Sequence, residues 1–151
     1  MKKSKKKLIV YCAMSGDIVH VGHINILKIA SKYGDVVLGV LTDKAISTYK
    51  KPPVQNYKQR KLLLESIRYV KKVIPQKTHD YSNNLNKLKP NIVVHGDDWR
   101  SGVQKKVREK VIKLLKTWNG KLVEPKYTKN ISSSLIKKKI LKRNHGTYKK
   151  R

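Results

Sequence analysis

The chain has 151 residues, the usual size of one domain, and is long enough to bury a core without disulfides or metals. Lys and Arg number 37 against 9 Asp and Glu, giving a formal net charge of +28, and no apolar run approaches the roughly 20 residues of a membrane span. Cys12 is the only cysteine, which excludes an internal disulfide and fits a reducing, cytoplasmic compartment.

The excess positive charge favours an anionic partner. Weak, non-specific binding of nucleic acid is one explanation. A lysine-rich composition without functional meaning is the other, because the lysines spread over the whole length and Arg, which makes most specific base contacts, is rare. Charge alone therefore assigns no function.

The first apolar stretch follows a cluster of lysines, an arrangement that resembles a short signal peptide. We predict a strand at 8–13 instead, because the stretch is short and continues into a motif that requires a strand. A helix is expected at 22–33, a second strand at 36–41 and a helical turn at 43–47. Two prolines, Pro52 and Pro53, then exclude regular helix.

The second half of the chain continues the alternation of strands and helices. A helix is expected at 57–69, with Leu62, Leu63, Ile67 and Val70 toward the core. The remaining predicted strands are 72–75, 91–95 and 122–123, and the remaining predicted helices are 80–88, 101–118 and 132–141. Within 101–118, the apolar residues expected to face the core begin at Val103.

This order predicts a Rossmann-like α/β domain over 1–141, an open five-stranded parallel sheet with helices on both faces, followed by a basic tail at 142–151. Ligands of such sheets bind beyond the carboxyl ends of the strands. Polar and glycine residues gather at those ends, at 13–17, 42–43, 96–98 and 127–128. The sequence therefore predicts a binding crevice there.

Two histidines, His20 and His23, flank Gly22 at the expected start of the first helix. Residues three apart share one helical face, and a helix N-terminus attracts anions. Glycine lets a phosphate approach closely. The pattern predicts a phosphate site. The alternatives are a zinc site, which needs more ligands than this pair, and ordinary helix-start residues.

The surrounding segment, 14–27, resembles the signature of the HxGH nucleotidyltransferases. The resemblance continues downstream, with motifs in the order found in glycerol-3-phosphate cytidylyltransferases, and covers about residues 8–140. These motifs are Arg60-Lys61, Arg68-Tyr69-Val70, His95-Gly96-Asp97-Asp98-Trp99 and Ile131-Ser132-Ser133-Ser134.

A neighbouring branch resembles the chain more closely: the cytidylyltransferase domains that accompany phosphoenolpyruvate mutase in phosphonate pathways. The shared features are Met-Ser-x-Asp at 14–17, Gly-Val-Gln at 102–104 and Tyr-Thr at 127–128. Tyr127 stands where the glycerol-phosphate family has Arg, and Lys71 where it has an acidic residue. We interpret these departures as a changed acceptor pocket.

The resemblance implies transfer of CMP from CTP to a small phosphonate or phosphorylated alcohol, with release of pyrophosphate. It also implies Mg²⁺ bound with CTP rather than at a separate protein metal site, and a homodimer. The alternatives are a glycerol-3-phosphate cytidylyltransferase, an adenylyltransferase of the same fold, and a basic nucleic-acid-binding module in which the histidine motif is incidental.

The resemblance also implies roles for individual residues. His20 and His23 would donate to the α-phosphate, and Lys50 or Lys51 would close over the phosphates. The nucleotide would contact Ser15, Gly16, Asp17, Gly22, Gly96, Asp97, Ile131, Ser132 and Ser133. The acceptor would contact Arg60, Arg68, Asp98, Trp99 and Tyr127.

Simpler explanations stay open for several of these residues. Lys50 and Lys51 could be ordinary surface lysines, and the Asp97-Asp98 pair could cap the following helix. The serines at 132–134 could form a plain N-cap. Trp99 could belong to the core.

Overall fold

The computed structural model describes residues 7–146. Five parallel strands form one sheet in the order β3-β2-β1-β4-β5, which confirms the predicted fold class. The strands are β1 (Ile9–Met14), β2 (Asp35–Leu41), β3 (Lys72–Gln76), β4 (Ile92–Val94) and β5 (Lys121–Val123).

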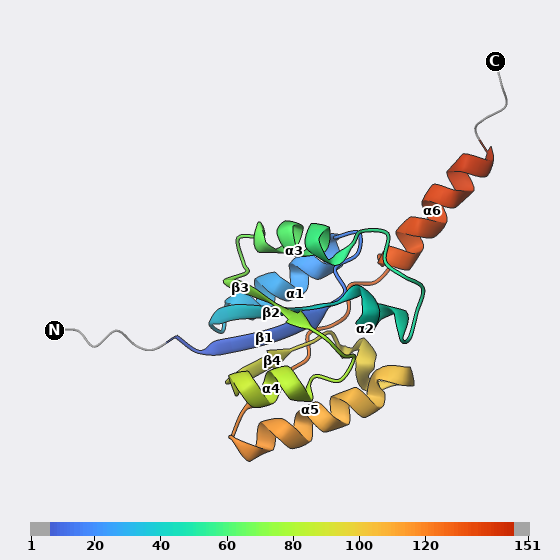
Figure 1. Ribbon diagram of the computed structural model, residues 1–151. Coiled ribbons are helices and arrows are strands. Elements are labelled where there is room, and N and C mark those ends of the chain that lie inside the picture. The colour runs from blue at the N-terminus through green and yellow to red at the C-terminus, as the bar shows by residue number, and fades with distance from the viewer. Residues whose placement is uncertain (1–6, 147–151) are drawn as a thin grey trace.

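Helices cover both faces of the sheet, as Figure 1 shows. On one face lie α1 (Val21–Ser31) and α3 (Tyr57–Glu65), and on the other lie α4 (Ser82–Leu88) and α5 (Lys105–Thr117). Each face has its own buried cluster, and β1 supplies both because its side chains alternate: Val10 and Cys12 join one cluster, Tyr11 and Ala13 the other. Such two-sided burial explains why the strand is continuously apolar.

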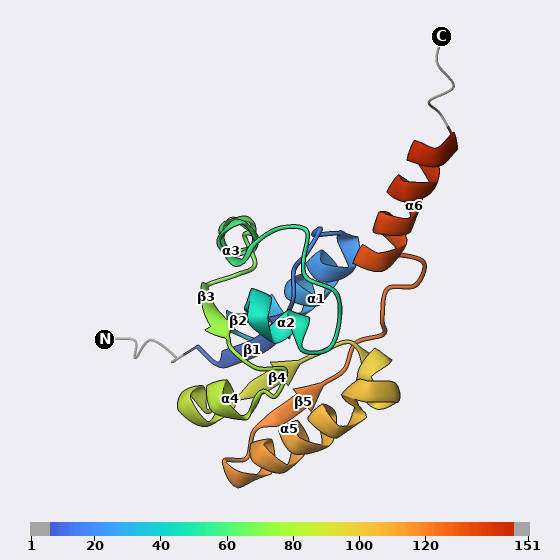
Figure 2. The same cartoon turned by 45° about the vertical axis from the view of Figure 1, so that its right-hand side comes forward.

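Two further helices lie toward the carboxyl ends of the strands. The short α2 (Asp43–Ser47) follows β2, and α6 (Ser133–Gly146) ends the described chain. Figures 1 and 2 both show α6 projecting away from the sheet. None of the helices within 7–146 is long and apolar enough to cross a membrane.

The expected core-facing residues of helix 57–69 were wrong for Leu62 and Leu63, whereas Ile67 and Val70 pack against the core as expected. Leu62 and Leu63 are 66% and 45% exposed, whereas Arg60 and Leu64 are fully buried. The helix also ends earlier, at Glu65. The buried positions are four residues apart and so share a face, which the charge of Arg60 concealed.

The predicted helix 101–118 is interrupted at its start. Short 3₁₀ turns occupy Asp97–Arg100 and Gly102–Gln104, and the α-helix begins only at Lys105. Ser101 is extended and Gly102 has φ +73°, so the backbone cannot continue as a helix there. Val103 is 84% exposed instead of facing the core.

The final helix extends beyond its predicted end at residue 141. Residues 142–146 belong to α6, which ends at Gly146, and the basic tail at 142–151 stays a prediction. Residues 147–151 lie outside the described residues, as do the lysines at positions 2, 3, 5 and 6 of the signal-like start.

Candidate active site

A cavity of about 270 Å³ lies where the carboxyl ends of the strands meet the first turns of α1 and α6. It occupies the crevice predicted from the order of strands and helices. Many of the predicted site residues line it: Ser15, His20, Gly22, His23, Lys50, Gly96, Asp98, Tyr127, Ser132 and Ser133.

His20 and His23 form a reciprocal cap at the start of α1. Nδ1 of His20 accepts the Gly22 N–H at 3.1 Å, and Nδ1 of His23 accepts the His20 N–H at 3.2 Å. A neutral imidazole that accepts at Nδ1 carries its proton on Nε2. Both rings line the cavity, and neither Nε2–H has an acceptor among residues 7–146, so both are donors available to a bound anion.

Burial keeps both imidazoles neutral near pH 7. Burial lowers the pKa of His20, and burial followed by the neighbouring His20 and Lys50 lowers the pKa of His23 to about 4. The ring centroids are only 4.0 Å apart, which disfavours two positive charges. The pair therefore acts as hydrogen-bond donors without a net charge of its own.

The lowered pKa of His23 predicts a loss of stability in acid. An unfolded histidine takes up a proton near pH 6.5, whereas folded His23 does so only near pH 4, so the folded state becomes less stable as the pH falls through this window. Between about pH 7.5 and 5, the native protein should lose about 2 kcal/mol more unfolding free energy than His23→Gln. Urea unfolding at the two pH values measures this, and equal losses in both proteins would contradict it.

Gly22 is required by the close approach of His20. A Cβ at this position would lie 2.9 Å from Cε1 of His20 and 3.0 Å from its Nδ1. Any side chain would push the imidazole out of its cap. The absence of a side chain at Gly22 therefore lets the His20 imidazole keep its capping position.

The first turn of α6 supplies a second group of donors. The Ser132 side chain accepts the Leu135 N–H at 3.1 Å, and the Ser132 carbonyl accepts the Ile136 N–H. The backbone N–H groups of Ser133 and Ser134 have no acceptor among the contacts of residues 7–146, and both residues line the cavity. Two helix N-termini therefore face the same space, as an anion site requires.

Lys50 is the only Lys or Arg among the residues that line the cavity within the described chain. Its Nζ lies 3.4 Å from Oγ of Ser15. Burial, and then the positive charge of Lys137, lowers its pKa. Lys51 is exposed and does not line the cavity. The structure thus brings Lys50, but not Lys51, to the histidine pair.

The cavity is close to neutral although the protein carries a charge of +28. Beside Lys50, the lining holds one carboxylate, Asp98, and the histidines His79 and His95, whose pKa values burial lowers. An anion in this cavity would therefore meet N–H donors rather than a large net positive charge.

Several lining residues were not predicted as site residues. Those with polar side chains are Tyr49, His79, Tyr81, His95, Gln104, Thr128 and Ser134. His79 and His95 follow the ends of β3 and β4, so the rule that ligands bind at strand ends could have identified them. The Tyr49 ring packs against His79 at a tilt, with ring centroids 4.4 Å apart, and no sequence signal indicated this contact.

Asp17 and Asp97 are occupied by contacts within the protein. The Asp17 carboxylate accepts the N–H groups of Val54 and Gln55, each at 3.0 Å. Asp97 accepts the Tyr127 N–H at 2.8 Å and does not line the cavity. Both carboxylates thus fix neighbouring segments in the structure.

Gly16 and Ile131 also lie behind the cavity surface. Gly16 has φ +66° and packs beside Leu64, so it shapes the turn that presents Ser15. The Ile131 carbonyl accepts a hydrogen bond from the Tyr127 hydroxyl at 3.2 Å. Their contribution to nucleotide binding remains a prediction.

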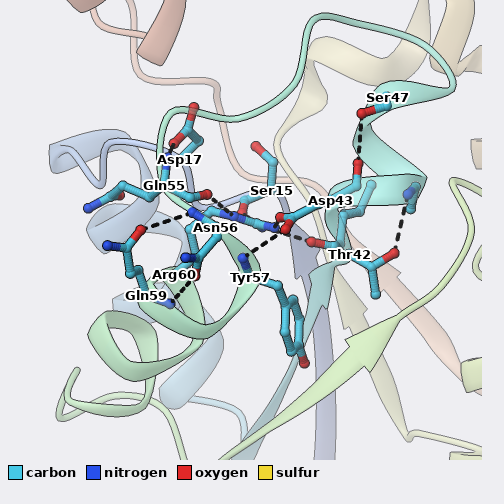
Figure 3. Close-up of polar contacts among 12 residues, drawn as sticks. Ser15, Asp17, Thr42, Asp43, Ser47, Gln55, Asn56, Tyr57, Gln59 and Arg60 are labelled. Atoms are coloured by element: carbon cyan, nitrogen blue, oxygen red, sulfur yellow. Dashed lines mark hydrogen bonds and ion pairs between the residues drawn. The ribbon is translucent and has the colours of Figure 1, made fainter.

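Arg60 lies beneath the cavity rather than in its wall. Its guanidinium is fully buried and donates to the carbonyls of Leu41 and Gln55, at 2.7 and 3.0 Å, and to that of Ser15. It also pairs with Asp43 at 2.6 Å. Figure 3 shows how Arg60 joins these loop ends. Each guanidinium nitrogen donates within the protein and the side chain is fully buried, so Arg60 does not face an acceptor.

Trp99 belongs to the core. It is 1% exposed, its ring stacks on His95 at 3.8 Å, and its Nε1–H donates to Glu124 at 2.8 Å. Glu124 also accepts a hydrogen bond from Arg108. This bond outweighs the opposite effect of burial and lowers the pKa of the Glu124 carboxyl to about 2. Trp99 therefore supports the cavity from below and does not line it.

Arg68 lies away from the cavity. It is exposed and lines a separate depression with Leu8 and Lys71, near the amino ends of β1 and β3. The sheet separates this depression from the histidine pair, because parallel strands place their amino ends at the opposite edge. The structure does not bring Arg68 to an acceptor at the cavity.

The chain matches a family model over residues 15–139, and the family is described as cytidylyltransferase-like. A glycerol-3-phosphate cytidylyltransferase of Bacillus subtilis strain 168 is 38% identical over 102 residues, covering 62% of this chain and 73% of that protein. An ethanolamine-phosphate cytidylyltransferase of Mus musculus is 35% identical over 91 residues, covering 59% of this chain and 22% of that protein.

Solved structures share the fold. A lipopolysaccharide core biosynthesis protein from Thermoplasma volcanium GSS1 has a TM-score of 0.67 at 21% identity and covers 83% of this chain and 99% of its own. A pantoate-beta-alanine ligase from Francisella tularensis has a TM-score of 0.57 at 17% identity and covers 88% and 69%. Because the family model spans most of the chain and its histidine motif lines the cavity, the chain belongs to the cytidylyltransferase-like family of nucleotidyltransferases.

Proposed function

We propose that the protein transfers CMP from CTP to a small phosphorylated alcohol and releases pyrophosphate. The observation that supports this most is the convergence of two helix N-termini and the Nε2–H groups of His20 and His23 on one cavity. These groups are donors, as a triphosphate requires.

The reaction needs positioning and charge stabilisation more than covalent help. An oxygen of the acceptor phosphate forms a bond to the α-phosphorus of CTP, and the bond from that phosphorus to the bridging oxygen of pyrophosphate breaks. His20 and His23 donate to the α-phosphate as its charge grows. Lys50 and the first turn of α6 hold the leaving phosphates.

Residues 7–146 contain no group of three or more His, Cys, Asp or Glu side chains placed to hold a metal ion. Asp98 is the only carboxylate of the cavity lining, so a divalent ion would enter with the triphosphate. Mg²⁺ bound in this way would neutralise charge on the triphosphate. The chain itself contributes the uncharged donors described above.

The relatives support a phosphorylated alcohol as acceptor over a phosphonate. Two cytidylyltransferases with which the chain shares 38% and 35% identity are named for glycerol 3-phosphate and ethanolamine phosphate. We therefore favour glycerol 3-phosphate as the first candidate. A homodimer is part of the same proposal, and light scattering with size-exclusion chromatography tests it.

A panel of nucleotides and acceptors tests the proposal. We expect pyrophosphate release with CTP and glycerol 3-phosphate to exceed that with ATP, UTP or GTP by roughly 10²-fold or more, because a site that hydrogen-bonds one base leaves polar groups unpaired with another. Ethanolamine phosphate and 2-aminoethylphosphonate serve as matched acceptors.

Three outcomes would contradict parts of the proposal. A preference for ATP would identify an adenylyltransferase, and a preference for 2-aminoethylphosphonate would restore the phosphonate acceptor. The absence of turnover with every pair, together with tight RNA binding at about 200 mM salt, would indicate a nucleic-acid-binding module.

A further inference from the structure

The helix α6 meets the rest of the domain through its first turns. The Ser133 hydroxyl donates to the Asp17 carbonyl. The Tyr127 hydroxyl donates to the carbonyl of Ile131, which lies two residues before the helix begins. Beyond these turns the helix projects away from the sheet (Figures 1 and 2). The first turn nevertheless forms a wall of the cavity, so its position has to be set by few contacts.

Lys137 provides one of those contacts. Its Nζ lies 2.7 Å from Oδ2 of Asp17, although the two residues are 120 positions apart in the chain. The lysine side chain is 36% exposed, and the carboxylate side chain only 4%. The next two residues of the helix, Lys138 and Lys139, are exposed, and neither pairs with Asp17 or with another carboxylate among residues 7–146.

The same carboxylate holds the loop that carries Lys50. Oδ2 and Oδ1 of Asp17 accept the N–H groups of Val54 and Gln55, and the Gln55 side chain accepts the Ile18 N–H at 3.3 Å. Asp17 therefore joins the segment that follows β1, the loop after α2 and the start of α6. Each of these segments contributes lining to the cavity.

Lys137 is the only cation paired with Asp17 among the described residues. Burial alone would raise the pKa of the Asp17 carboxyl, but the hydrogen bonds from Lys137, Gln55 and Val54 outweigh it and lower the pKa. A buried carboxylate that loses its cation either takes up a proton or moves toward water. Either change weakens its hold on the loop amides.

We propose that Lys137 is a positioning residue of the nucleotide site: its ion pair with Asp17 fixes the first turn of α6 and the Lys50 loop relative to each other. The kinetic part of this inference rests on the proposed function. Lys137 acts through Asp17 and the loop amides, without touching the reacting atoms.

Amide hydrogen exchange tests the positioning without any assay of activity. In Lys137→Met, exchange of the Val54 and Gln55 amides should become roughly tenfold faster than in the native protein, although the substitution lies on another helix. Lys138→Met is the matched control, with one neighbouring lysine removed from the same helix, and should leave these amides unchanged. Lys137→Arg, which keeps the charge, should restore most of the protection.

Kinetics provide the second readout. Lys137→Met should raise KM for CTP roughly tenfold, a change of about 1.4 kcal/mol, with kcat altered much less. In a double-mutant cycle, Lys137→Met should add little to Asp17→Asn, because both substitutions break the same pair.

The outcomes separate this inference from the proposed function. Unchanged loop amides in Lys137→Met, or equal acceleration in Lys138→Met, would overturn the positioning role. A raised KM with unchanged amides would also overturn it and would indicate direct contact of Lys137 with CTP. Faster loop exchange in a protein that turns over no CTP would support the positioning role and refute the proposed function.

Discussion

Replacing either His20 or His23 with alanine should lower kcat by roughly 10²–10³, the usual cost of one donor to the charge that develops in a transition state. Each ring presents its Nε2–H to the cavity, because its Nδ1 accepts a backbone N–H. Donors of this kind bind the transition state more strongly than the ground state, so KM for CTP should change less than kcat.

The two histidines act as a unit, so the double variant should lose less than the product of the two single losses. Single-turnover assays with CTP measure the chemical step, and thermal unfolding of each variant monitors the fold. Turnover near that of the native protein in either folded variant would remove the histidine pair from the mechanism.

Replacing Arg60 with methionine should destabilise the protein by about 3–5 kcal/mol. The carbonyls of Ser15, Leu41 and Gln55 would lose their buried donor, and the ion pair between residue 60 and Asp43 would be lost as well. Urea unfolding measures the loss. Arg60→Lys should recover only part of it, since an ammonium lacks the planar fork that reaches several acceptors at once.

Arg68→Met is the matched control for this experiment. Arg68 is exposed, and substitutions at such positions usually change stability by no more than about 0.5 kcal/mol. The earlier hypothesis that Arg60 binds the acceptor makes the opposite prediction. It requires an Arg60→Met protein of nearly native stability whose KM for the acceptor is raised.

The sheet and the position of the cavity could be predicted from the sequence because both depend on local patterns. The apolar runs at 8–13 and 36–41 correspond to β1 and β2 within one or two residues. The histidine motif was informative because its spacing, its glycine and its place after a strand all indicate the same anion site.

Other features could not be predicted because they depend on contacts between distant residues. Nothing near Arg60 in the sequence indicates that three carbonyls from separate segments of the chain surround its guanidinium. The same holds for Trp99, whose partner Glu124 lies 25 residues later. Asp17 lies within the motif segment 14–27, yet its partner Lys137 lies 120 residues away.

The separation along the chain of the two helix starts that face the cavity bears on biosynthesis. The ribosome makes the His20 motif well before Ser133 and Ser134. A nascent chain could therefore complete its sheet, which ends with β5 at Val123, before the first turn of α6 can form its wall of the cavity. A polypeptide released just before α6 would be folded in its core but deprived of one wall of the cavity.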